Sequence, residues 1–179
     1  MNIRIIGVGN VHMSDDGFGP YVARVLEALY ELPEYVQIID GSTPGLDLAQ
    51  HLVNADAVIF VDTVTSGGRS GELHEFRLTD LLQHPPLARL SPHDPGVAEA
   101  LLTVAAAGMG PREALIVGVV PEWVATGVQL SAAVRAAIHP VIGLITTELS
   151  RLGVRLVPRT VPRPPETWWE RAGPHAVAS

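Results

Sequence analysis

Residues 3–26, IRIIGVGNVHMSDDGFGPYVARVL, decide the fold of this chain. The apolar segment from Ile3 to Val8 is typical of a strand, and a helix is expected from about Asp16. The apolar residues of that helix recur at the spacing of one helical face: Phe18, Tyr21, Val22, Val25, Leu26 and Leu29. The stretch therefore predicts the start of an alternating strand–helix fold.

The same alternation continues to about residue 152. Further strands are predicted at Val36 to Asp40, Ala57 to Asp62, residues 71–78 and Ala114 to Val120. Further helices are predicted at Leu46 to Val53, at Val97 to Ala105 after Pro95, and from a Ser131 N-cap to about Leu152, with a kink or a new start at Pro140. Residues 71–78 alternate imperfectly, which favours an edge or antiparallel strand. This order predicts the α/β class: a three-layer sandwich with a mostly parallel twisted sheet covered by helices on both faces.

The chain length and its prolines indicate one domain with a tail. At 179 residues the chain predicts a single domain, which we place at residues 1–155. Residues 156–179 hold five prolines and form the predicted Pro-rich C-terminal tail. Trp168 and Trp169 are expected to pin this tail to the domain surface.

Composition excludes several kinds of chemistry. The chain has no Cys, and all 12 of its Lys+Arg residues are Arg. Thiolate ligands, Cys nucleophiles, Schiff-base lysines and the lysine of a P-loop are therefore excluded. The net charge of −7 argues against a nucleic-acid partner. We find no export leader and no apolar run long enough for a membrane span, so we expect a cytoplasmic, monomeric protein with no membrane contact.

Candidate site residues follow the strands, where ligands of such sheets bind. Asp16 follows the first strand, Asp62 ends the third, and His93 lies in the later loop SPHDPG. Two carboxylates and one imidazole suit a divalent ion such as zinc, manganese or nickel. The simpler interpretation is a helix cap, which we favour for Asp15 and weigh evenly against the metal site for Asp16.

A dinucleotide site is the competing interpretation of the first turn. Gly7-Val8-Gly9 follows a strand, and Asp40 ends the next one. However, His12 stands where the third glycine of the fingerprint belongs, and two aspartates at the helix start would repel a pyrophosphate. A nucleotide-binding module is therefore the weaker alternative.

Several motifs, taken together, resemble the hydrogenase maturation proteases. These endopeptidases trim the C-terminus of the large subunit of nickel-iron hydrogenases. The motifs are GVGNVHMSDDGFGPYVARVLEAL, DGSTPGLDL, AVIFVDTV, SPHD and GVVPEWVATGVQLSAAV, and they span about residues 3–150 in the family's order. The tail after about Leu152 has no matching motif.

The resemblance implies a phosphorylase/hydrolase-like fold and a peptidase active on a large-subunit precursor after nickel insertion. It implies that Asp16, Asp62 and His93 bind metal, with Asp16 and Asp62 as the catalytic pair. The metal is expected to be nickel supplied by the precursor, and zinc or another divalent ion is expected to substitute in the free protein. Water activated by the metal and water activated by a carboxylate base both remain open. A non-catalytic, nickel-dependent assembly checkpoint is the alternative from another functional class.

Overall fold

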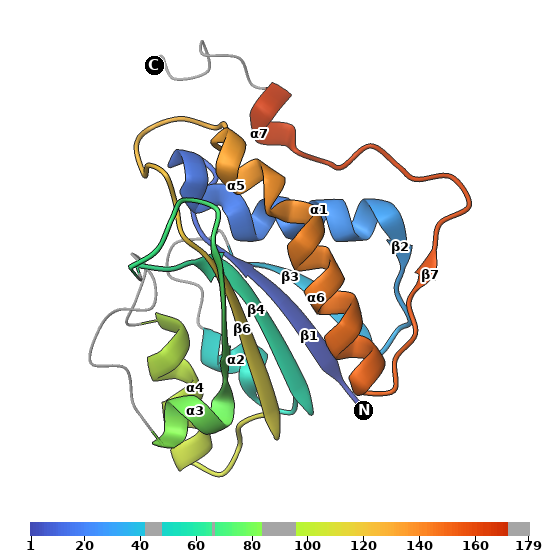
Figure 1. Cartoon of the computed structure of the whole chain (residues 1–179). Helices are drawn as coiled ribbons and strands as arrows, with labels where there is room; N and C mark the ends of the chain where they lie inside the picture. The colour runs from blue at the N-terminus through green and yellow to red at the C-terminus, as the bar shows by residue number, and fades with distance from the viewer. Residues whose placement is uncertain (42–47, 66, 84–95, 172–179) are drawn as a thin grey trace, which may run out of the picture.

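The computed structural model describes residues 1–41, 48–65, 67–83 and 96–171 (Figure 1). Its centre is a five-stranded sheet in the order β3-β1-β4-β6-β5. The strands are β1 (Ile3–Val8), β3 (Val36–Gly41), β4 (Ala57–Thr63), β5 (Leu73–Arg77) and β6 (Glu113–Val119). The first three and β6 are parallel, whereas β5 pairs antiparallel with β6 at the edge. The mostly parallel sheet and its antiparallel edge strand are thus confirmed.

Helices cover both faces of this sheet (Figure 1). One layer contains α1 (Phe18–Leu29), α5 (Ala132–Ala136) and α6 (Ile138–Arg151), and the other contains α2 (Leu48–Leu52), α3 (Leu78–Gln83) and α4 (Gly96–Ala106). Alternate residues of β1 serve the two layers, because side chains of a strand point to opposite faces. Ile3 and Ile5 join the α1–α6 core, whereas Ile6 and Val8 join the α2–α4 core. The three-layer α/β sandwich is confirmed.

The first helix begins later than expected, and α3 was not expected at all. The first helix was expected from about Asp16, but a 3-10 turn, η1 (Ser14–Gly17), precedes α1. Ser131 caps α5 as predicted, with its hydroxyl accepting a hydrogen bond from the Val134 amide at 3.3 Å. The expected break also occurs, because α6 begins at Ile138 and places Pro140 in its first turn. The short elements β2 (Tyr30–Glu31), β7 (Val157–Pro158) and α7 (Trp168–Arg171) were not predicted.

The stretch Ala132–Arg151 is long and apolar enough to cross a membrane by length and composition alone. The expectation that no segment reaches this length was wrong. In the fold this stretch is α5 and α6, and Val141, Ile145 and Leu149 of α6 are fully buried against the sheet core. Its apolar residues are therefore accounted for by core packing.

The C-terminal segment is fastened along α1. The amides of Arg159 and Arg163 donate to the carbonyls of Leu29 and Ala28 at 2.8 and 3.0 Å. Trp169 is only 1% exposed and joins the α1–α6 core, so it pins the segment as expected. Trp168 is 54% exposed and makes only an edge contact at the domain surface, with its ring centroid 5.9 Å from that of His12.

Glu170 forms the polar part of this attachment. Its carboxylate accepts hydrogen bonds from Tyr21 Oη (2.9 Å), Arg135 (2.9 Å) and Thr167 Oγ1 (3.1 Å). Burial raises the pKa of Glu170. The hydrogen bonds and the Arg135 charge lower it by a larger amount, so the pKa lies below its ordinary value of 4.5. The ionised form is therefore the one that the folded protein stabilises.

We expect Glu170→Gln to destabilise the protein by about 1 kcal/mol at pH 6, because charge-assisted hydrogen bonds are lost. Since the folded pKa is lowered, the contribution of Glu170 is present above pH 4.5 and is lost as the pH falls through the folded pKa. Urea unfolding of both proteins at a series of pH values measures the difference. A difference that stayed constant down to pH 3 would contradict this account.

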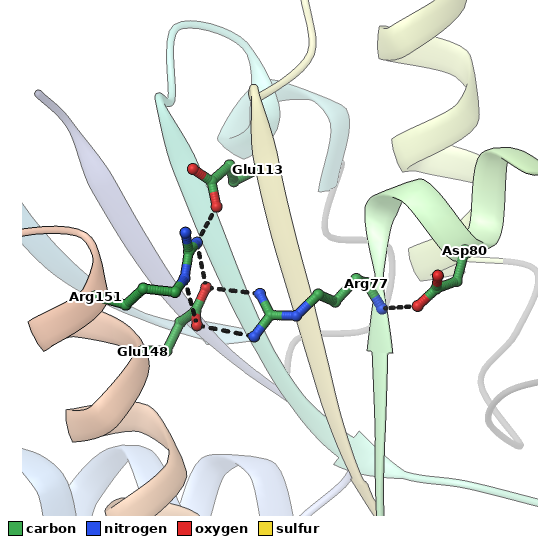
Figure 2. Close-up of polar contacts among 5 residues, drawn as sticks. All are labelled: Arg77, Asp80, Glu113, Glu148 and Arg151. Carbon is green, nitrogen blue, oxygen red and sulfur yellow. Dashed lines mark hydrogen bonds and ion pairs between the residues drawn. The ribbon is translucent and has the colours of Figure 1, made fainter.

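Glu148 ties α6 to the far edge of the sheet (Figure 2). This buried carboxylate accepts two hydrogen bonds from Arg77 of β5, both at 3.0 Å, and two from Arg151, at 2.8 and 3.0 Å. Arg151 also bonds to Glu113 at the start of β6. The side chain of Glu148 is 5% exposed, whereas those of both arginines are more than 40% exposed. Glu148 is therefore the buried centre of the cluster.

We expect Glu148→Ala to lower the free energy of unfolding by about 2 kcal/mol. Removing one partner of a buried ion pair costs about 3–5 kcal/mol, and the exposure of both arginines reduces that cost because water can solvate them. Glu113→Ala is the matched control, because the Glu113 side chain is 45% exposed and its removal should cost less than about 0.5 kcal/mol. Equal losses in the two variants would contradict the central role of Glu148.

Candidate active site

The turn after β1 brings η1 against the carboxyl end of the sheet. Gly9 has a φ of +134°, and a Cβ at this position would overlap the Asp16 carbonyl. Only glycine fits this turn without strain. The tight turn therefore fixes where the side chains of η1 lie.

Asp16 and Asp62 meet at Thr63, all three being at most 2% exposed. Oδ1 of Asp16 accepts a hydrogen bond from the Thr63 hydroxyl at 3.3 Å, and Oδ2 accepts one from the backbone N–H of Asn10 at 2.8 Å. The Thr63 amide donates to Asp62 Oδ1 at 2.7 Å. Thr63 thus contacts two predicted site residues that lie 46 positions apart in sequence.

Two buried carboxylates that both contact Thr63 are costly unless they are hydrogen-bonded, coordinate a cation or share in proton transfer. Their oxygens are hard donors, which suit a divalent ion, and either carboxylate has the chemistry of a general base. Thr63 and Asn10 supply hydrogen bonds that orient them. Sequence reasoning missed both residues; Thr63 follows Asp62 directly, but nothing in the local pattern shows that its hydroxyl faces η1.

His93 lies outside the described residues. Within the described part of the chain, no group of three His, Asp or Glu side chains is placed to hold a metal ion. The three-ligand metal site with Asp16, Asp62 and His93 therefore stays a prediction. The carboxylate oxygens of Asp16 and Asp62 are donors that a divalent ion accepts.

Asp15 does not cap a helix, so the expected role for it was wrong. Its Oδ2 accepts the amides of Glu122 and Trp123 at 2.8 and 3.1 Å, and its Oδ1 accepts the Ser131 amide at 2.6 Å. The start of α1 has no side-chain cap. Asp15 instead fastens the loop after β6 to η1, and the local sequence carries no sign of partners that are 107 to 116 residues away.

The acidic residue of the dinucleotide alternative is engaged elsewhere. Asp40 accepts a hydrogen bond from Arg24 of α1 at 2.9 Å. Burial lowers the pKa of Arg24, but Glu27 and Asp40 raise that pKa by more. The two carboxylates therefore stabilise the charged form of Arg24. Together with two aspartates at the start of the first helix, it argues against a nucleotide site here.

A mostly parallel sheet covered by helices on both faces, with two buried carboxylates at its carboxyl edge, defines an α/β protein with a candidate site where such sheets bind ligands. A family model described as hydrogenase maturation protease matches residues 20–148. The chain belongs to this family, and it is an endopeptidase of hydrogenase maturation.

Individual relatives agree with this assignment. The chain is 32% identical to the hydrogenase 2 maturation protease of Escherichia coli (strain K12), covering 89% of this chain and 97% of that protein. It is 36% identical to the hydrogenase expression/formation protein HupM of Azotobacter chroococcum mcd 1, covering 88% and 76%. Among solved structures, the hydrogenase maturating endopeptidase HybD from E. coli matches with a TM-score of 0.80 and 31% identity, over 89% of this chain and 99% of that one.

Proposed function

We propose that this endopeptidase removes the C-terminal extension of a nickel-iron hydrogenase large-subunit precursor after nickel has been inserted. The observation that carries the proposal is that the buried carboxylates of Asp16 and Asp62, which lie at or after the carboxyl ends of two neighbouring strands, both accept hydrogen bonds from Thr63. Two buried carboxylates at the carboxyl edge of the sheet suit hydrolysis by activated water, since the chain has no Cys or Lys nucleophile. As part of the same proposal, the protein acts as a monomer in the cytoplasm.

In this proposal Asp16 and Asp62, with His93, hold the nickel that arrives with the precursor. When bound there, nickel would supply Lewis-acid chemistry, which activates water and polarises a carbonyl group. The residues of the chain then have three tasks. Asp16 and Asp62 orient the ion or take the proton of the attacking water, Thr63 keeps the two carboxylates in place, and the Asn10 amide fixes the second oxygen of Asp16.

The test is the mass of the precursor. Incubation with nickel-loaded precursor should shorten it to one product, as measured by mass spectrometry. A non-catalytic checkpoint would bind the precursor and leave its mass unchanged. Membership of a protease family favours cutting over this alternative.

We expect nickel-free precursor to remain uncut, because two or three protein ligands without a thiolate hold a metal only weakly by themselves. The isolated protein should accordingly purify with much less than one metal ion per chain. Metal analysis of the protein and a cleavage assay with and without a chelator measure both. Efficient cutting of nickel-free precursor in the chelator would leave a carboxylate-only mechanism, with Asp16 and Asp62 as the catalytic groups.

A further inference from the structure

The loop of residues 121–130 borders the candidate site. It follows β6, whose Gly118 and Val119 pair with Asp62 and Thr63 of β4. The loop therefore leaves the sheet at the same carboxyl edge, next to the strand that supplies Asp62. Figure 1 shows it arching from β6 to α5 beside the first turn of the chain.

This loop is held in one shape by the segment around Asp15. The Asp15 carboxylate, 0% exposed, accepts the amides of Glu122 and Trp123. Ser14 adds a hydrogen bond from its hydroxyl to the Ala125 carbonyl at 2.9 Å and one from its amide to the Gly127 carbonyl at 2.8 Å. Because its backbone is already fixed, the loop loses little further entropy when a partner binds.

The same loop presents apolar side chains to solvent. Trp123 is 49% exposed and Val124 is 39% exposed, although their backbone is anchored. A large aromatic side chain on a rigid backbone is the kind of residue that dominates binding at protein interfaces. No described neighbour makes a ring contact with Trp123.

We propose that Trp123 and Val124 are a docking surface for the large-subunit precursor, contacting an apolar part of it next to the segment being cut. This inference rests on the proposed function and adds a binding surface to it. Position favours the precursor, because the loop leaves the strand paired with Asp62 and is anchored to Asp15, the neighbour of Asp16.

The test measures binding apart from cutting. In protein carrying Asp62→Asn, which is not expected to cut, adding Trp123→Ala should weaken the binding of nickel-loaded precursor at least tenfold. In otherwise unchanged enzyme, Trp123→Ala should raise KM at least tenfold and change kcat less than twofold. Tyr35→Ala is the matched control, because Tyr35 is a 45% exposed aromatic whose carbonyl bonds Ile3 at the opposite, amino edge of the sheet. Its KM should equal that of the unchanged enzyme.

Unchanged Kd and KM in Trp123→Ala would overturn the docking surface while leaving the proposed function intact. Sedimentation could also overturn it. If the unchanged protein formed dimers, and Trp123→Ala abolished them without altering precursor binding, the surface would belong to a second copy of the chain. If the unchanged enzyme bound the precursor without cutting it, the proposed function would fail. The tenfold loss of binding in Trp123→Ala would then still support the surface.

Discussion

We expect Asp62→Asn to reduce precursor cutting by at least about 100-fold, the usual contribution of a group that moves a proton or positions an activated water. The asparagine keeps a carbonyl oxygen for the Thr63 amide, which lies 2.7 Å from Asp62 Oδ1. It loses the negative charge that either mechanism needs. The fold should survive, because the change is isosteric and leaves one negative charge instead of two at Thr63.

The rate and the melting temperature should be measured on the same preparation, with the melting temperature shifting by less than about 4 °C. Asp56→Asn is the matched control, because Asp56 precedes the same strand at its other end and its side chain is 45% exposed. That variant should cut normally. An Asp62→Asn protein that unfolded would return Asp62 to a structural role, and one that cut at the normal rate would remove it from the catalytic machinery.

Local patterns predicted the elements that surround the site. The apolar run of β4 and the helical period of α1 are strong signals because each depends on neighbours within a few residues. Asp62 stood out for the same reason: a carboxylate that ends a fully apolar strand needs a partner. Asp16 followed from its place after β1.

The interactions that organise the site are non-local, and periodicity does not show them. Asp15 and Asp16 have the same side chain and adjacent positions, yet Asp15 bonds the loop after β6 and Asp16 bonds Asn10 and Thr63. Both residues lie in the 3-10 turn η1, and their side chains point to different partners there. The expected helix, which would start at Asp16, does not include Asp15. One signal was available, because Phe18 stands three residues after Asp15, where a capping box would have Glu or Gln.

At Gly19 the backbone of α1 lies directly against the backbones of β1 and β4. A Cβ there would overlap the carbonyl oxygens of Val8 and Val61, at the ends of β1 and β4. Gly7 of β1 is restricted from the other side, since its Cβ would overlap the Gly19 carbonyl. The absence of side chains at Gly7 and Gly19 is what lets α1 lie on the two strands that position Asp16 and Asp62.

We therefore expect Gly19→Ala to destabilise the protein by about 3 kcal/mol, at the upper end for added core volume, because backbone carbonyls cannot move aside as a side chain can. Displacing the start of α1 by about 1 Å would also move Asp16 and reduce cutting about 100-fold in whatever protein still folds. Urea unfolding and the cleavage assay measure the two losses.

Gly143→Ala is the matched control for this substitution. Gly143 is an exposed residue of α6, and a Cβ there would meet nothing within 4 Å. Alanine in an open helical position should stabilise the protein by about 0.5–1 kcal/mol and leave cutting unchanged. The two glycines thus predict opposite signs for one chemical change, and a Gly19→Ala protein as stable and active as Gly143→Ala would show that α1 does not need its close contact with β1 and β4 to hold Asp16 beside Asp62.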